Sequence, residues 1–131
     1  MPTARRDRAR VAVRIDPDVW REEVERLDPG SPRRVAAERE RPRLARQGIE
    51  FTQLQRCAEA GDDRTRLPGL LKAYVPIREA PPSQRRFGMI FSPELGPGLA
   101  LVAFGERHPR IGTRTVYERA HKRLHGRYPD E

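Results

Sequence analysis

Residues 99–104 form the longest unbroken apolar run in the chain, and they read Leu99-Ala100-Leu101-Val102-Ala103-Phe104. A continuous apolar run of this length is typical of a β-strand that is covered on both faces, because apolar side chains do not alternate with polar ones. The Gly96-Pro97-Gly98 triplet directly before the run indicates a turn. We therefore predict a central strand over residues 99–104.

The residues on either side of this run extend the prediction to a small sheet and a closing helix. Residues 70–77 and 87–91 are predicted to form two earlier strands, joined by a turn at Pro81-Pro82-Ser83. Pro76 has no backbone N–H to donate, which indicates an edge or a strand end. After the central strand, a helix is predicted from about residue 113 to 125, with an apolar stripe of Val116, Ala120 and Leu124.

The first half of the chain is predicted to contain one strand and three helical segments. Residues 11–15 alternate in the period-two pattern of a half-buried strand. Asp16-Pro17 and Ser31-Pro32 each place a capping side chain before a proline, so helices are predicted from these positions to Leu27 and Glu40. Pro42 is expected to interrupt the second helix, and a third helix is predicted from there to about Ala60, with Gly61 at its end.

Aromatic and cysteine side chains in this half are assigned to the core. Trp20 and Phe51 are expected beneath the sheet. Cys57 is interpreted as a small buried hydrophobe on the same side as Leu54, rather than as a nucleophile. Because Cys57 is the one cysteine of the chain, an internal disulfide is excluded and a reducing compartment is expected.

The predicted order is one strand, helices, three consecutive strands and a closing helix, an order of the β-α-α-β-β-β-α type. Such an order indicates the α+β class, with a small antiparallel sheet and helices packed on one face. The chain has 131 residues, which suits one domain. We assign residues 1–9, which have nothing to bury, to a flexible basic arm and residues 10–128 to a single folded domain.

The composition favours a polyanionic partner. The net charge is +8, and 25 of the 27 basic residues are arginine, the two lysines being Lys72 and Lys122. A bias toward arginine codons explains that ratio without any function, whereas the net charge itself attracts nucleic acid or an acidic protein. No run of 18 apolar residues and no signal peptide is present, so a cytoplasmic location without membrane contact is expected.

Several short motifs in the second half of the chain carry a family resemblance. Leu67-Pro68-Gly69 stands directly before residues 71–75, and this pattern is similar to the L-x-G that leads into the second strand of the RelE/ParE superfamily of toxin proteins, which the chain resembles over about half of its length. Residues 85–91 and 101–108 stand where the family has its third strand and its fourth strand with a glycine-basic exit, and residues 116–124 resemble its closing helix. Many members carry an arginine directly after the aromatic residue of the third strand, where this chain has Gly88.

The resemblance implies a toxin that cleaves mRNA on the ribosome by metal-independent transesterification and that is inhibited by an acidic antitoxin. It implies that Arg86 and Arg107 hold the phosphate, that His108 exchanges a proton and that Tyr117 assists. No cofactor and no metal are expected. Further RNA contacts are expected from the basic side chains of Lys72, Arg78, Arg85, Arg110 and Arg114.

Other interpretations stay open at this point. A loop histidine such as His108 is more often solvated than catalytic, and Tyr117 is equally suited to packing against the sheet. His121 and His125, four residues apart on a helix, are interpreted as a surface pair rather than a metal site. If these residues are not catalytic, two alternatives remain. The chain is either a non-catalytic protein similar to the gyrase-inhibiting branch of the superfamily, or a non-toxic protein that binds nucleic acid or protein through its basic sheet.

Overall fold

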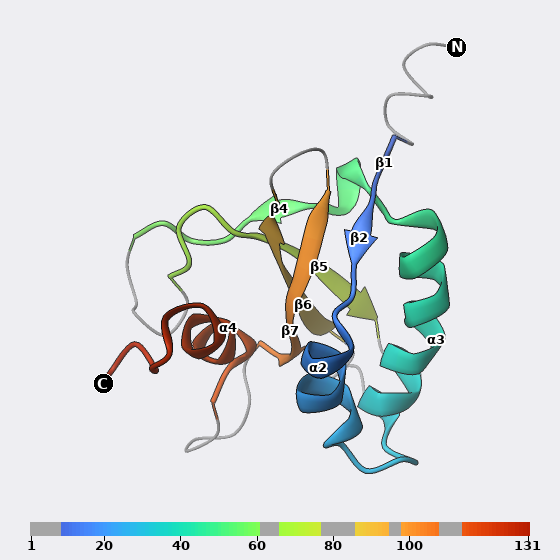
Figure 1. The fold of residues 1–131 in the computed structure, drawn as a ribbon, viewed down its shortest axis with the longest axis horizontal. Coiled ribbons are helices and arrows are strands. Elements are labelled where there is room, and N and C mark those ends of the chain that lie inside the picture. The colour runs from blue at the N-terminus through green and yellow to red at the C-terminus, as the bar shows by residue number, and fades with distance from the viewer. Residues whose placement is uncertain (1–8, 61–65, 77–85, 95–97, 108–113) are drawn as a thin grey trace.

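The computed structural model describes residues 9–60, 66–76, 86–94, 98–107 and 114–131, and for Val75, Pro76 and Arg86 it describes the backbone alone (Figure 1). Within these ranges the chain forms a five-stranded sheet in the order β2-β7-β6-β5-β4. The predicted mixed α+β class is confirmed. Among the described residues, no helix has the length and hydropathy needed to cross a bilayer.

The predicted three-stranded meander forms the centre of this sheet. It consists of β5 (Leu71–Pro76), β6 (Arg86–Pro93) and β7 (Leu99–Glu106), each antiparallel to the next. The sheet has two short outer strands, of which β2 (Val13–Arg14) is parallel to β7 and β4 (Gln55–Arg56) is antiparallel to β5. A separate pair joins β1 (Arg10–Val11) to β3 (Ile49–Glu50).

Strand β7 is buried on both faces, as its unbroken apolar sequence predicts. The pairing of β7 with β6 contains a β-bulge. Ile90 pairs with Ala103, but the next residue, Phe91, pairs with Leu101, so Val102 is an extra residue on β7. Val102 and Ala103 consequently belong to one core cluster, while the next residue, Phe104, returns to the other. This bulge lets β7 supply large side chains to two cores.

Helices cover both faces of the sheet, so the prediction of helices on one face is wrong. Helix α4 (Val116–His125) packs against Ile90, Val102 and Ala103, and α2 (Pro17–Trp20) and α3 (Pro32–Gln47) cover the opposite core (Figure 1). The physical reason is β7 itself, because a strand that is apolar on both sides needs a helical layer on each. On α4 the predicted stripe is buried at Val116 and Ala120 but exposed at Leu124.

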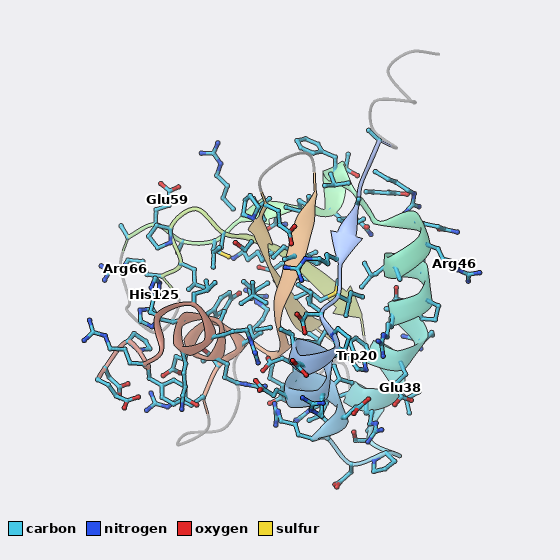
Figure 2. All side chains as sticks on the ribbon, in the orientation of Figure 1. Trp20, Glu38, Arg46, Glu59, Arg66 and His125 are labelled. Atoms are coloured by element: carbon cyan, nitrogen blue, oxygen red, sulfur yellow. The ribbon has the colours of Figure 1, made fainter. Side chains whose placement is uncertain are left out.

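Helix α2 begins as its sequence predicts. The Asp16 carboxylate accepts a hydrogen bond of 2.8 Å from the backbone N–H of Asp18, and Pro17 occupies the first turn. The helix continues as a π-helical turn, η1 (Arg21–Glu25). Trp20 is 4% exposed and lies on the side of α2 that faces α3 in Figure 2, within the main core cluster, which confirms its assignment to the core.

Pro42 does not interrupt α3, which begins at Pro32 and continues to Gln47. A proline leaves the carbonyl four residues earlier, that of Glu38, without its helical donor. Glu38 and Pro42 are both exposed, so water can satisfy that carbonyl. The predicted break is therefore wrong because the proline lies on the solvated face.

The helix predicted between Pro42 and Ala60 is wrong as well, because α3 ends at Gly48. Gly48 has φ +66 and ψ −156, a conformation restricted to glycine, and a Cβ there would lie 2.1 Å from the carbonyl oxygen of Val11. The chain then forms β3, a 3₁₀ turn over Phe51–Gln53 and β4. Phe51 is 63% exposed, so its assignment to the core is wrong, whereas Cys57 is buried.

A buried carboxylate joins the N-terminal segment to both β7 and α4. Glu23, on η1, is 3% exposed, and one of its oxygens accepts a 3.1 Å hydrogen bond from the backbone N–H of Phe104. The other oxygen accepts hydrogen bonds of 2.6 Å from Arg119 and 3.1 Å from Arg123. Strand β2 ends beside Ala100, so Glu23 provides an acceptor for β7 where no strand continues.

Replacing Glu23 by glutamine should destabilise the fold. Glutamine keeps the shape but leaves Arg119 without a counter-charge and Arg123 with Glu22 alone, which should lower the free energy of unfolding by about 3 kcal/mol, the lower end for a buried pair. Urea denaturation followed by circular dichroism measures the change. Glu22, whose side chain is 60% exposed and contacts Arg123 at 2.8 Å, is the matched control, and Glu22→Gln should cost less than about 1 kcal/mol. Equal losses in the two variants would contradict this role of Glu23.

Replacing Gly48 by alanine should destabilise the fold more than the same change at Gly69. Both glycines have positive φ, but a Cβ meets nothing within 4 Å at Gly69 and meets the Val11 carbonyl at Gly48. We expect a loss of about 1 kcal/mol for Gly69→Ala and about 3 kcal/mol or more for Gly48→Ala. Urea midpoints test this, and similar midpoints would show that the contact with Val11 is unimportant.

Candidate functional site

Two cationic and two phenolic side chains converge on the α4 side of the sheet. Lys72 and Tyr74 come from β5, Arg107 follows the end of β7, and Tyr117 lies in the first turn of α4. Lys72 and Tyr74 are two residues apart on a strand, so both face α4, whereas the intervening Ala73 belongs to the opposite core. We call these four residues the Lys72–Arg107 cluster.

A row of glycines lets Arg107 reach across the sheet. Tyr74 pairs with Gly88, and Gly88 pairs with Gly105, so no side chain stands between the ring of Tyr74 and the end of β7. The guanidinium carbon of Arg107 lies 4.2 Å from the centroid of the Tyr74 ring. A Cβ on Gly88 would lie 3.4 Å from Cγ of Arg107 and 3.2 Å from Cγ1 of Val116. Glycine at this position therefore permits both the crossing of Arg107 and the close approach of α4.

Tyr117 is the buried member of the cluster, and its position is fixed by the start of α4. A capping box at the start of α4, in which Thr115 and Glu118 exchange hydrogen bonds of 3.1 Å, fixes the first helical turn. The Tyr117 hydroxyl accepts a 3.2 Å hydrogen bond from Nε of Arg107, and the residue is 4% exposed. Burial raises the pKa of Tyr117 above its usual value, although the hydrogen bond from Arg107 and the charge of Lys72 oppose the rise. The phenol is therefore neutral at physiological pH and orients Arg107.

Lys72 contributes a second positive charge. Its ammonium nitrogen lies 5.6 Å from the ring centroids of both Tyr74 and Tyr117. Partial burial lowers the pKa of Lys72, but the side-chain hydrogen bond with Tyr74 and the neighbouring phenols outweigh that effect, so the pKa of Lys72 is raised overall. The ammonium group is charged at neutral pH and is suited to electrostatic stabilisation rather than to accepting a proton.

The arrangement is suited to binding a phosphate group. Within the described residues, the two terminal nitrogens of Arg107 have no hydrogen-bond partner, since only Nε is occupied. A guanidinium group with both terminal nitrogens available is able to bind two oxygens of one phosphate, and the ammonium of Lys72 adds positive charge. Of the described residues, no three His, Cys, Asp or Glu side chains gather into a metal site.

The structure brings three of the predicted site residues together, namely Lys72, Arg107 and Tyr117. Arg114 has other contacts, because it binds Glu118 at 2.7 Å and Asp130 at 2.8 Å. For Arg86 only the backbone is described, opposite Pro76 at the start of β6. The remaining predicted residues lie outside the described residues, and they are Arg78, Arg85, His108 and Arg110.

Tyr74 is the member of the cluster that sequence reasoning did not assign to the site. A signal for it exists, because Tyr74 follows Lys72 by two residues in a predicted strand and must share its face. The glycine pair that opens the path to Tyr74 is invisible without strand register, since Gly88 and Gly105 are 17 positions apart in sequence.

His121 and His125 form a pair on the outer side of α4. Their ring centroids are 4.5 Å apart, and Nδ1 of His121 lies 2.8 Å from the carbonyl oxygen of Arg127. Figure 2 shows His125 at the surface near Arg66. This placement agrees with the interpretation of the two histidines as a surface pair.

Comparisons with known proteins identify no relative of this chain. No protein-family model, curated protein or solved structure matches the chain significantly.

Cys57 should react slowly with thiol reagents in the folded protein. Its burial raises the pKa of the thiol to about 11, although the nearby charge of Lys72 acts to lower it. At pH 8 about one thiol in a thousand is then ionised, and the thiolate is the reactive form. We expect a disulfide reagent at pH 8 to modify Cys57 at least 100-fold more slowly in the native protein than in 6 M urea. Fast native modification would contradict the buried, neutral thiol.

Proposed function

We propose that the chain is a RelE-like toxin that cleaves mRNA on the ribosome, with the scissile phosphate bound by the Lys72–Arg107 cluster. The observation that carries this proposal is the convergence of Arg107 and Lys72, from two non-adjacent strands, over Tyr74 and Tyr117. The order of an antiparallel meander followed by α4 supports it as well. The net charge of +8 suits both an RNA substrate and an acidic antitoxin in the cytoplasm.

In the proposed reaction the RNA supplies its own nucleophile. The 2′-oxygen forms a bond to the adjacent phosphorus while its proton passes to His108, which follows Arg107 directly in the chain. The bond between phosphorus and the 5′-oxygen then breaks, and that oxygen takes a proton from water. The products are a 2′,3′-cyclic phosphate and a 5′-hydroxyl end.

The cluster would act mainly on the charge that develops at phosphorus. The terminal nitrogens of Arg107, together with Arg86, would bind the non-bridging oxygens, and Lys72 would add a fixed positive charge. Tyr117 is a positioning residue in this scheme, because its hydroxyl is buried and holds Nε of Arg107. The ring of Tyr74 lies against the same guanidinium group.

One observation favours a second candidate, a non-catalytic protein of similar fold that binds nucleic acid or another acidic partner. Among the described members of the cluster there is no exposed group suited to proton transfer at neutral pH, since Tyr117 is buried and Lys72 stays charged. Such a protein would use the same cations to bind phosphates and would leave the RNA intact. Its binding would weaken steeply with salt.

Neutralising one cation of the cluster should abolish most of the RNA cleavage. We expect Lys72→Gln and Arg107→Gln each to reduce the cleavage rate of ribosome-bound mRNA by about 100-fold, the effect of removing one donor to a developing charge. Lys122→Gln is the matched control, because Lys122 is the other lysine of the chain and is exposed on α4, beside the ring of Tyr128. Sequencing gels with end-labelled mRNA measure the rates.

The outcomes of this experiment separate the two candidates. Cleavage by the wild-type protein that is unaffected by Arg107→Gln would refute the assigned phosphate site. Intact mRNA, combined with salt-dependent RNA binding that requires Lys72 and Arg107, would establish the non-catalytic candidate in place of the toxin.

A further inference from the structure

A second concave site lies on the other side of the sheet, between α3, β3 and the meander. It is a pocket of about 350 Å³. Its apolar wall is formed by side chains of the main core, and Tyr74, whose ring faces α4, borders it at the edge of β5. The apolar lining residues are Leu44, Ile49, Ala73 and Met89. The proposed phosphate cluster does not account for this pocket, because α4 takes no part in it.

Positive charge surrounds this apolar wall. Arg39 and Arg43 lie one turn apart on α3, and Arg10 comes from β1. Arg10 contacts Glu50 at 3.2 Å, and Glu40, the acidic residue that lines the pocket, lies 3.9 Å from Arg39. In the described part of the chain Arg43 makes no ion pair. The pocket therefore has more cations than its own carboxylates neutralise.

An apolar wall beneath a cationic rim selects a ligand that is planar and apolar at one end and anionic at the other. Ligand pockets are usually about 300 to 1,000 Å³, so this one, at the lower end, has room for a single nucleotide rather than a larger cofactor. Arginine matches a phosphate group with two parallel N–H donors. A simple inorganic anion has no apolar part that would contact the wall. A fatty acid has one carboxylate, which does not require three arginines around the pocket.

We propose that this pocket binds one nucleotide, with its base against Ile49 and Met89 and its phosphate at Arg39 and Arg43. The nucleotide has two conceivable sources, a free mononucleotide or one unit of an RNA strand. The second source depends on the proposed function. Tyr74 borders the pocket as an edge residue while its ring contacts Arg107 on the α4 side, and β4 pairs only with Leu71 and Lys72, so the β5 edge beside Tyr74 is open in the described structure. An RNA strand passing this edge would reach both sites.

The test compares two arginines of the same helix. Arg43 lines the pocket, whereas Arg46 points away from the sheet in Figure 2 and bonds to the carbonyl of Pro42. Arg43→Gln and Arg46→Gln change the net charge equally, so non-specific attraction falls equally in both. Isothermal titration calorimetry with adenosine 5′-monophosphate, ribose 5-phosphate and a pentaadenylate strand made resistant to cleavage by 2′-deoxy substitution gives the affinities.

We expect Arg43→Gln to raise the Kd of a nucleotide ligand at least 10-fold and Arg46→Gln to change it less than 2-fold. If Arg43→Gln weakens the binding of adenosine 5′-monophosphate, the natural ligand is a free nucleotide. If Arg43→Gln weakens the binding of the pentanucleotide alone, the pocket is a subsite for one unit of a strand. Equal effects of the two variants, absence of binding by both nucleotide ligands, or equal affinity for ribose 5-phosphate and the mononucleotide would overturn the proposal.

A third variant separates this proposal from the proposed function. Arg107→Gln removes a cation on the α4 side of the sheet and leaves the pocket intact. If the wild-type protein cleaves no RNA but Arg43 is required for nucleotide binding, the toxin proposal fails and the pocket proposal stands. If cleavage requires Arg107 but the two α3 variants bind alike, the pocket proposal alone fails.

Discussion

The buried carboxylate of Glu23 is the contact on which the arrangement of layers depends. Strand β7 is paired with β2 for two residues only, and beyond them its edge would expose the backbone N–H of Phe104 to an apolar interior. Glu23 satisfies that donor and binds Arg119 and Arg123 of α4 with its other oxygen. One carboxylate thus joins the helical layers on the two sides of the sheet around its edge, and the ion cluster makes their relative position specific.

The candidate phosphate site follows from the positions of the layers. Helix α4 approaches the sheet closely because Gly88 and Gly105 lie beneath Val116, and the same absence of side chains leaves a path for Arg107. Gly88, in the middle strand of the meander, thus admits an arginine from the end of β7.

Much of the fold could be predicted from local sequence, and the errors arise where contacts distant in sequence decide the outcome. The meander and the caps at Asp16 and Ser31 are encoded locally, and they agree with the structure. The end of α3 at Gly48 depends on the approach of Val11, which no local pattern reveals. In the same way, the resemblance to the RelE/ParE superfamily pointed to Lys72 and Arg107, whereas the contribution of Tyr74 required the register of three strands.

The parallel pairing of β2 with β7 has a consequence for the order of folding. Val13 pairs with Leu99, and Glu23 binds residues that lie 96 and 100 positions later, so the sheet closes through contacts between distant parts of the chain. Contacts of such long sequence separation slow folding, because the entropy of closing large loops is lost before any contact compensates it. During synthesis, the Glu23 carboxylate on η1 would therefore stay hydrated until Arg119 and Arg123 have left the ribosomal exit tunnel.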